Sequence, residues 1–180
     1  FLYQLEVIKR LGLPGVDFYD RGGYILFHNM IKLLNTLSGK KEDFEPMKDR
    51  DVGMFVCGPT VYDQSHIGHI RTYVVFDVIA KYLRHKGYKV RYIMNITDID
   101  DRIIDRAREE GKDWKEISET YEKDFLESME SLGVDGVEKY IRATDHIKEI
   151  IKQVKTLLDK GYAYQINEGI YFDISKFKDY

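Results

Sequence analysis

The chain has 180 residues, a length typical of one domain, and 43% hydrophobic with 33% charged residues is an ordinary globular mixture. The formal charge of −3 gives no overall basic surface for nucleic acid, and no apolar run approaches the roughly 18 residues that span a bilayer, so no membrane partner is expected. A single cysteine excludes an internal disulfide and indicates a reducing, cytoplasmic location.

The first part of the chain has little regular pattern. A short helix is expected over 3–11, and the many charged residues between 38 and 52 predict a solvated loop. The pattern sharpens at a short apolar run, Gly53–Cys57, which predicts a buried strand.

A helix and a second strand follow. Residues 71–86 have helical periodicity, Gly87 suits a helix C-terminus, and Lys89–Ile96 reads as a strand. We expect the charged residues, Asp77 among them, to lie mainly opposite the apolar stripes, which are Val74, Val78, Tyr82 and Val75, Ile79, Leu83. A strand, a helix and a strand in this order predict a parallel pair joined by a crossover, the unit of an α/β fold.

Three more helices and a hairpin are predicted. Thr97, Asp113 and Thr144 are the expected helix starts, and the last helix ends at Gly161. The second of these helices has an apolar stripe of Trp114, Ile117, Tyr121, Phe125, Met129 and Leu132. The residues 167–169 between two apolar runs predict the hairpin.

The segment C-G-P-T-V-Y-D-Q-S-H-I-G-H, from Cys57 to His69, carries the candidate chemistry. It leaves the carboxyl end of a strand, where open parallel sheets bind ligands, and enters a helix. His66 and His69 then lie near a helix N-terminus, where unpaired backbone N–H groups and the dipole favour anions. Two imidazoles there can donate hydrogen bonds to phosphate oxygens during phosphoryl or nucleotidyl transfer. Gly68 lets a flat base or ribose approach the backbone.

Each residue alone also has a structural explanation. A histidine near a helix start is usually a cap, a lone cysteine is usually a small buried hydrophobe, and Gly58-Pro59 is a turn. Asp98, Asp100 and Asp101 are better explained by a helix start than by a metal site.

Together the residues resemble a known family. His66-Ile67-Gly68-His69 is the four-residue signature of class I aminoacyl-tRNA synthetases. Its context closely resembles cysteinyl-tRNA synthetases over 54–63, 71–77 and 95–101, and Leu34–Ser38 and Arg142–Ile147 fit the same family. The similarity runs from Met30 to the last residue.

The resemblance implies a Rossmann-type catalytic domain split by an inserted connective domain. Residues 1–29 would be an extension, 30–141 the first half of the catalytic domain, and 142–180 the beginning of the insertion, with the chain a piece of something longer. Family members use ATP to convert L-cysteine to cysteinyl-adenylate, release pyrophosphate and transfer cysteine to tRNA(Cys).

The resemblance also implies roles for individual residues. His66 and His69 would be catalytic and stabilise the α-phosphate of ATP, whose Mg²⁺ would need no dedicated protein cage. Cys57 would bind a zinc ion that selects the thiolate of the substrate, with the remaining ligands beyond residue 180. The other implied contacts are Pro59, Thr60 and Gly68 with ATP, and Gly58 and Thr97 with cysteine.

Ile70 departs from the family, because a small residue usually stands there, and it could crowd the nucleotide side. The second ATP motif and the other zinc ligands are not found in these 180 residues, so we expect the chain alone to be inactive.

Three alternatives remain open. The first is the related ligase that joins cysteine to an amino sugar in mycothiol synthesis. The second is a non-catalytic paralogue that binds nucleotide or RNA through basic residues, namely Lys81, Arg84, His85, Lys86, Lys89 and Arg91, although a solvated helix end also explains this cluster. The third, a small nucleotidyltransferase, leaves Cys57 and the segment 95–101 unexplained.

Overall fold

The computed structural model describes residues 31–178, and the chain divides into two compact units between Met47 and Lys48. In the described part of the first unit, β1 (Lys32–Asn35) and β2 (Lys40–Asp43) form an antiparallel hairpin. The prediction of a loop over 38–52 is therefore wrong for β2, whose exposed charged residues are ordered by cross-strand backbone pairing. It is also wrong for Asp51 and Val52, which begin a strand. The helix expected over 3–11 and the extension 1–29 lie outside the described residues.

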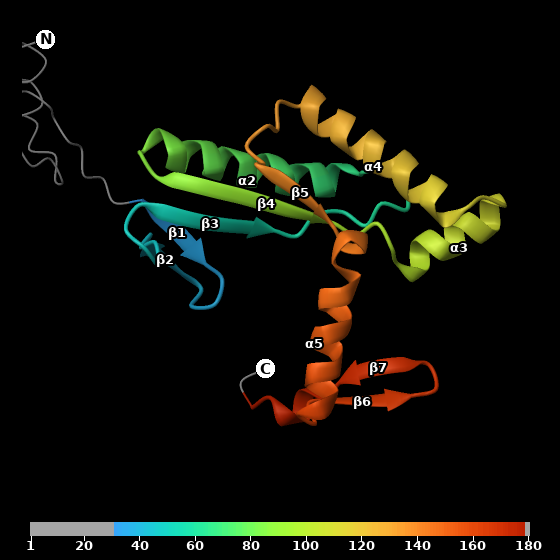
Figure 1. Cartoon of the computed structure of the whole chain (residues 1–180). Coiled ribbons are helices and arrows are strands. Elements are labelled where there is room, and N and C mark those ends of the chain that lie inside the picture. The colour runs from blue at the N-terminus through green and yellow to red at the C-terminus, as the bar shows by residue number, and fades with distance from the viewer. Residues whose placement is uncertain (1–30, 179–180) are drawn as a thin grey trace, which may run out of the picture. The chain divides into compact units, whose positions relative to one another are not determined.

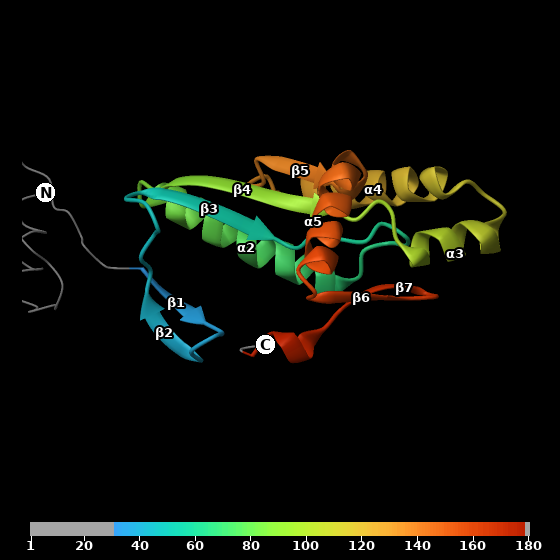
Figure 2. The same cartoon turned by 60° about the horizontal axis from the view of Figure 1, so that its bottom comes forward.

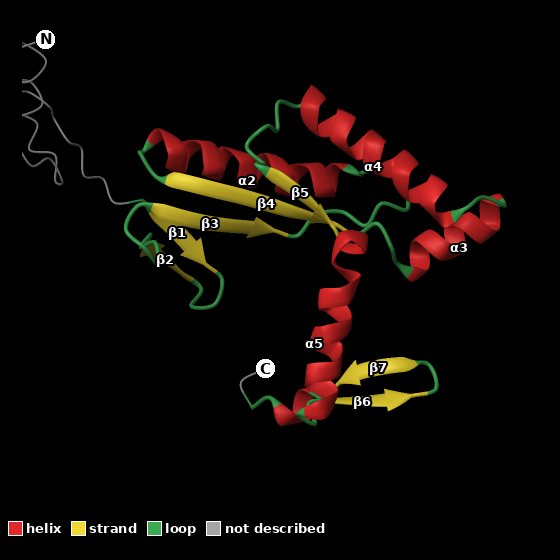
Figure 3. Cartoon of the chain, in the orientation of Figure 1, coloured by secondary structure: helices red, strands yellow, loops and turns green. Residues whose placement is uncertain are grey.

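A parallel sheet forms the centre of the second unit (Figures 1 and 3). Its described strands are β3 (Asp51–Val56), β4 (Lys89–Ile96) and β5 (Lys139–Arg142), in that order, with both pairings parallel. The two predicted strands and their parallel pairing are confirmed. However, β3 runs from Asp51 to Val56 rather than over Gly53–Cys57, and only Val52 and Val56 of its residues are buried. The strand β5 was missed, because four residues with only partial burial give no periodic signal.

Helices connect the strands. α2 (Ile67–His85) joins β3 to β4, while α3 (Asp101–Glu110) and α4 (Trp114–Ser131) lie between β4 and β5. The ring of Tyr73 in α2 meets the ring of Phe125 in α4 edge to face, with centroids 5.3 Å apart. The two helices therefore pack together through buried aromatic rings.

The buried face of α2 differs from the prediction. Its buried residues are Tyr73, Asp77, Ala80 and Leu83, whereas Val74, Val75, Val78 and Tyr82 are exposed. The carboxylate of Asp77 is satisfied inside, because it accepts the Gly136 N–H at 2.6 Å and pairs with Lys81 Nζ at 2.7 Å. A buried charge is tolerated when partners satisfy it, as they do for Asp77. The charge of Asp77 was therefore a misleading guide to which side of α2 faces solvent.

Two helix starts also need correction. α2 begins at Ile67 rather than near residue 71, and the cap of α3 is Asp100 rather than Thr97. Thr97 instead extends the sheet by pairing with Thr60. The cap at Asp113 is confirmed; Ile117, Phe125 and Met129 of the predicted stripe are buried, but Leu132 is exposed.

The last described elements follow β5 along the chain (Figures 1 and 2). A 3₁₀ turn η1 (Ala143–His146) leads into α5 (Ile147–Asp159), so the helix predicted from Thr144 starts later than expected. The predicted hairpin is confirmed as β6 (Ala163–Ile166) and β7 (Gly169–Phe172), and a second 3₁₀ turn, η2 (Ile174–Lys176), follows. Within residues 31–178, no helix is both long and apolar enough to cross a membrane.

A small apolar cluster holds the loop that leaves β3. Val61, only 1% exposed, packs with Ile96 at the end of β4 and with buried residues of α3 and α4, which are Ile103, Ala107 and Ile117. The burial of Val61 in this cluster fixes the loop after β3 at the carboxyl end of the sheet.

Candidate functional site

The chain bulges where it leaves β3. The last regular pair of β3 and β4 is Val56 with Met94, and the next is the isolated bridge of Thr60 with Thr97. Four steps along the first segment (56 to 60) therefore match three along the second (94 to 97), which leaves one extra residue, as in a β-bulge. Bulges re-aim side chains next to functional sites.

Cys57 and Gly58 lie in this bulge. Cys57 is exposed rather than turned into the apolar interior, and its thiol makes a long contact of 3.8 Å with the Gly58 carbonyl oxygen. Burial, and secondly the nearby Cys57 thiol, raises the pKa of Tyr73 to about 12.

Gly58 is closely packed against the end of β4. Its N–H donates to Asn95 Oδ1 at 2.9 Å. A Cβ at this position would lie 1.8 Å from the Asn95 carbonyl oxygen and 2.8 Å from Met94 Cγ. The structure therefore requires a residue without a side chain here.

The two histidines stack at the start of α2. His66 is the N-cap, and its Nδ1 accepts the Gly68 N–H at 3.1 Å. A neutral imidazole that accepts through Nδ1 carries its proton on Nε2, so Nε2 remains a donor. The rings of His66 and His69 are 3.6 Å apart between centroids. Partial desolvation, and secondly the neighbouring His66, lowers the pKa of His69.

The expectation of unpaired backbone N–H groups at this helix start is wrong for two residues. Gly68 donates to the His66 ring, and the N–H of His69 donates to the His66 carbonyl oxygen at 3.0 Å. The Ile70 N–H makes the first regular helical bond, also to the His66 carbonyl oxygen, at 3.3 Å. Contact with an anion would therefore depend more on the imidazole N–H groups. A Cβ on Gly68 would lie 2.9 Å from His66 Cε1, so the absent side chain also makes room for the capping ring.

Hydrogen bonds join the other predicted residues. The N–H of Thr97 donates to the Pro59 carbonyl oxygen at 2.9 Å, and the Val61 N–H donates to the Thr97 carbonyl oxygen at 3.2 Å. Arg102 Nη2 donates to Thr60 Oγ1 at 3.1 Å. Gly58, Pro59, Thr60 and Thr97 thus lie together at one end of the sheet.

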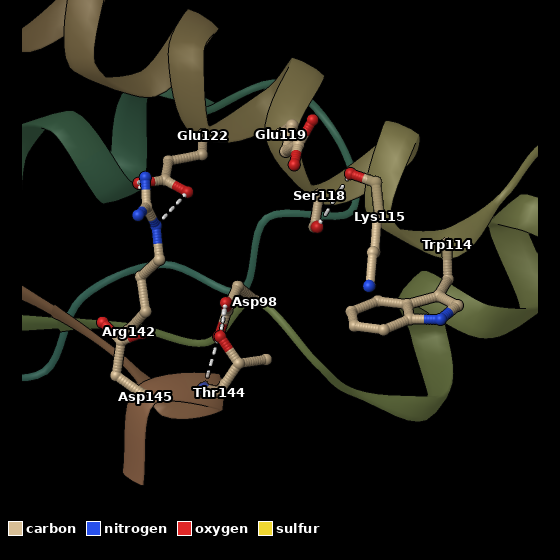
Figure 4. Close-up of a pocket in the computed structure, with 9 residues that line it drawn as sticks. All are labelled: Asp98, Trp114, Lys115, Ser118, Glu119, Glu122, Arg142, Thr144 and Asp145. Carbon is tan, nitrogen blue, oxygen red and sulfur yellow. Dashed lines mark hydrogen bonds and ion pairs between the residues drawn. The ribbon is translucent and has the colours of Figure 1, made fainter.

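A polar cavity of about 420 Å³ lies beyond Thr97 (Figure 4). It is lined by Asp98, Trp114, Lys115, Ser118, Glu119, Glu122, Arg142, Thr144 and Asp145. The buried carboxylate of Asp98 accepts from the Thr144 N–H at 3.0 Å and from its hydroxyl. Both oxygens of buried Glu122 accept from Arg142 Nε at 2.9 Å, which raises the pKa of Arg142.

These pairs satisfy the cavity's two buried carboxylates from within the chain. They connect the loop after β4 to η1, and α4 to the end of β5. Sequence reasoning missed Glu122 and Arg142 as partners, because they are 20 residues apart and only the fold brings them together.

Comparison with known proteins supplies the deciding observation. Residues 43–180 match the family described as the catalytic domain of class I (C) tRNA synthetases. The chain belongs to this family. The family resemblance inferred from the sequence is confirmed.

The relatives of this synthetase domain include two cysteine–tRNA ligases. The chain is 55% identical over 150 residues to the cysteine–tRNA ligase of Thermococcus kodakarensis, covering 83% of this chain and 32% of the relative. It is also 55% identical over 151 residues to the cysteine–tRNA ligase of Pyrococcus furiosus. That match covers 84% of this chain and 32% of the relative. The chain thus spans about a third of the length of the curated relatives it matches.

Solved structures support the fold alone. Methionyl-tRNA synthetase of Mycobacterium tuberculosis, in complex with methionyl-adenylate, gives a TM-score of 0.56 at 22% identity, over 62% of this chain and 23% of that one. A LeuRS–tRNA–LeuAMS ternary complex from Agrobacterium radiobacter K84 gives a TM-score of 0.57 at 23% identity. The match covers 68% of this chain and 16% of that one. The predicted α/β fold of the class I synthetase type is confirmed.

The described part of this synthetase domain does not make a metal centre by itself. Within it, no group of three or more His, Cys, Asp or Glu side chains could hold a metal ion. Cys57 offers one thiol, whereas a zinc site takes three or four protein ligands. Asp100 caps α3 and Asp101 lies in its first turn, as the helix-start explanation predicted. Asp98 lies before the helix and instead accepts hydrogen bonds from Thr144, so the helix-start explanation is wrong for Asp98.

The basic cluster is partly committed to internal contacts. Lys81 Nζ lies 2.7 Å from Asp77 and 2.5 Å from Asp135. Arg84 donates to the carbonyl oxygens of Val90 and Gly136 at 3.1 and 2.9 Å. These contacts favour a structural role for the two residues over phosphate binding.

Proposed function

We propose that this domain takes part in ATP-dependent activation of L-cysteine to cysteinyl-adenylate and in its transfer to tRNA(Cys), as a cysteine–tRNA ligase. The observation that carries the proposal is the bulge that presents Cys57 and Gly58 next to Thr97, at the sheet end from which the histidine-capped helix α2 starts. The names of the curated relatives support it. In this proposal, residues 30–141 are the first half of the catalytic domain, and 142–180 begin the connective insertion.

The proposed reaction is adenylate formation by displacement at the α-phosphate. The carboxylate of cysteine attacks the phosphorus of ATP, and pyrophosphate leaves with its bridging oxygen. His66 and His69 donate N–H hydrogen bonds to the oxygens on which negative charge grows. Pro59, Thr60 and Gly68 contact ATP, which carries its own Mg²⁺, while Gly58 and Thr97 contact cysteine.

Cys57 is the proposed zinc ligand of this chain. Cysteine differs from serine by one atom, and a pocket that judges size alone separates such pairs by roughly 10–200-fold. When bound, zinc would supply a preference for a soft thiolate over an alcohol. The exposed thiol is available for this role, and the other ligands would have to come from outside residues 31–178.

The alternatives receive less support. An amino-sugar ligase would share the cysteine activation, but the two relatives described above carry the name cysteine–tRNA ligase. A paralogue would bind RNA through the basic cluster, but Lys81 and Arg84 of that cluster already make contacts within the chain, which disfavours phosphate binding by these two residues. The proposed partners are therefore ATP, L-cysteine and tRNA(Cys), with the cytoplasm as the place of action.

The test uses a complete enzyme. Residues 31–178 replace the matching segment of the Thermococcus kodakarensis ligase, and cysteine-dependent ATP–pyrophosphate exchange and tRNA(Cys) cysteinylation are measured. We expect both activities, and His69→Ala should lower kcat of exchange by about 10²–10³-fold, because one donor to the developing charge is lost. Asn35→Ala, a change in the β1–β2 hairpin, should leave exchange unchanged. An active chimaera indifferent to His69→Ala would contradict the proposed site.

A further inference from the structure

We infer that Asn95 is a positioning residue of the cysteine-selecting site: its side-chain amide holds the Cys57–Gly58 bulge in place and directs the hydroxyl of Thr97 toward the substrate. The second half of this inference rests on the proposed function. The first half is a statement about the chain itself and is tested separately.

The carbonyl end of the Asn95 amide replaces a missing ladder bond. The extra residue between the two paired positions takes Gly58 out of the regular β3–β4 ladder. Asn95 Oδ1 accepts the Gly58 N–H at 2.9 Å, in a partly buried position. The main chain of Gly58 already packs against the main chain of Asn95, with no space for a Cβ. Asn95 therefore holds the bulge in two ways, through a hydrogen bond from its side chain and through the packing of its main chain.

The amino end of the same amide orients Thr97. Asn95 Nδ2 donates to Thr97 Oγ1 at 3.2 Å. An amide NH₂ can only donate, so the Thr97 oxygen accepts and its own hydrogen stays available to a third group. The backbone of Thr97 is held by hydrogen bonds to Pro59 and from Val61. The hydroxyl can thus present a fixed donor, which a thiolate or carboxylate of the substrate can accept.

Two substitutions separate the two halves of the amide. Asn95→Ala removes both contacts. Asn95→Asp keeps an oxygen for the Gly58 N–H, but a carboxylate cannot donate, so it would capture the Thr97 hydrogen for itself. Asn35→Ala is the matched control, because Asn35 also makes side-chain hydrogen bonds but lies in the β1–β2 hairpin.

The first measurement is amide hydrogen exchange of Gly58 by NMR, in the 180-residue chain without ligands. We expect exchange about tenfold faster in Asn95→Ala, the loss of one hydrogen bond, and near wild type in Asn95→Asp and Asn35→Ala. Equal Gly58 exchange rates in the wild type and Asn95→Ala would overturn the positioning of the bulge.

The second measurement is the KM for cysteine and for ATP in pyrophosphate exchange, using the chimaeric ligase. Asn95→Asp should raise the KM for cysteine by about 10- to 100-fold, because the Thr97 donor is lost, and change the KM for ATP by less than about threefold. A purely structural Asn95 predicts a normal KM for cysteine in Asn95→Asp, and that result would overturn the recognition half. An inactive wild-type chimaera would instead count against the proposed function and against the role of Asn95 in cysteine recognition. The Gly58 exchange rates would still test whether Asn95 positions the bulge.

Discussion

Gly58 and Gly53 lie five positions apart, yet the space around them differs. A Cβ on Gly58 would overlap the Asn95 carbonyl oxygen, whereas a Cβ on Gly53 would meet no atom within 4 Å. Gly58→Ala should lower the free energy of unfolding by about 1–3 kcal/mol or more, since backbone must move. Gly53→Ala should be neutral or stabilising by up to about 1 kcal/mol. Urea denaturation of both variants checks this; equal effects would contradict the packing of the bulge.

The pH response of His69 has a defined sign. Its pKa is lowered in the folded chain, while the unfolded value is about 6.5. Below pH 6.5 the unfolded chain therefore binds more protons, and the stability associated with neutral His69 is lost as pH falls through its folded pKa. We expect its ring C–H resonance to titrate below 6.5, and His66→Ala to move the midpoint upward by removing the secondary cause. A midpoint at or above 6.5 would contradict the prediction.

At the scale of the element, the buried carboxylate of Asp77 connects α2 to the loop before β5. It accepts the Gly136 N–H and pairs with Lys81, which also pairs with exposed Asp135 and donates to the Gly133 carbonyl oxygen. Asp77→Ala should cost about 1–3 kcal/mol of unfolding free energy, because the Gly136 N–H loses its acceptor. Asp135→Ala should have little effect, since an exposed ion pair contributes little. Thermal unfolding distinguishes the two; similar losses would mean that burial is not the cause.

The orientation of α2 gives a second prediction at this scale. Val78 is 58% exposed, although the sequence pattern placed it in an apolar stripe, whereas Ala80 is 0% exposed. Val78→Lys should change the free energy of unfolding by no more than about 0.5 kcal/mol. Ala80→Lys should prevent stable folding, because it buries an unpaired charge. Circular dichroism during denaturation measures both, and a large loss for Val78→Lys would show that this face is covered.

At the scale of the whole molecule, the 180-residue chain is expected not to form cysteinyl-adenylate alone. It spans about a third of its relatives, and its described residues supply one thiol and no metal-binding group. ATP–pyrophosphate exchange with cysteine should stay at background, while the chimaera is active. Cysteine-dependent exchange by the isolated chain would contradict this prediction.

The sequence alone predicted the elements whose signals are local. The apolar run of β3, the alternation of β4, the helical period of α2 and the cap at Asp113 depend on residues within a few positions of each other. The paired histidines and the residues around them are likewise enough to indicate the family, because that signature is contiguous in the chain.

Only the tertiary structure decided which side of α2 is buried, why Gly58 must lack a side chain, and how Asn95 joins the bulge to Thr97. Asp77 meets Gly136 59 residues away, and Asn95 meets Gly58 37 residues away. The sequence shows that a residue is polar, but it does not show which partner that residue will have. The free energy of burying a polar residue depends on such a partner, which only folding brings into contact. The carboxylate and the amide therefore became interpretable only once their partners were in place.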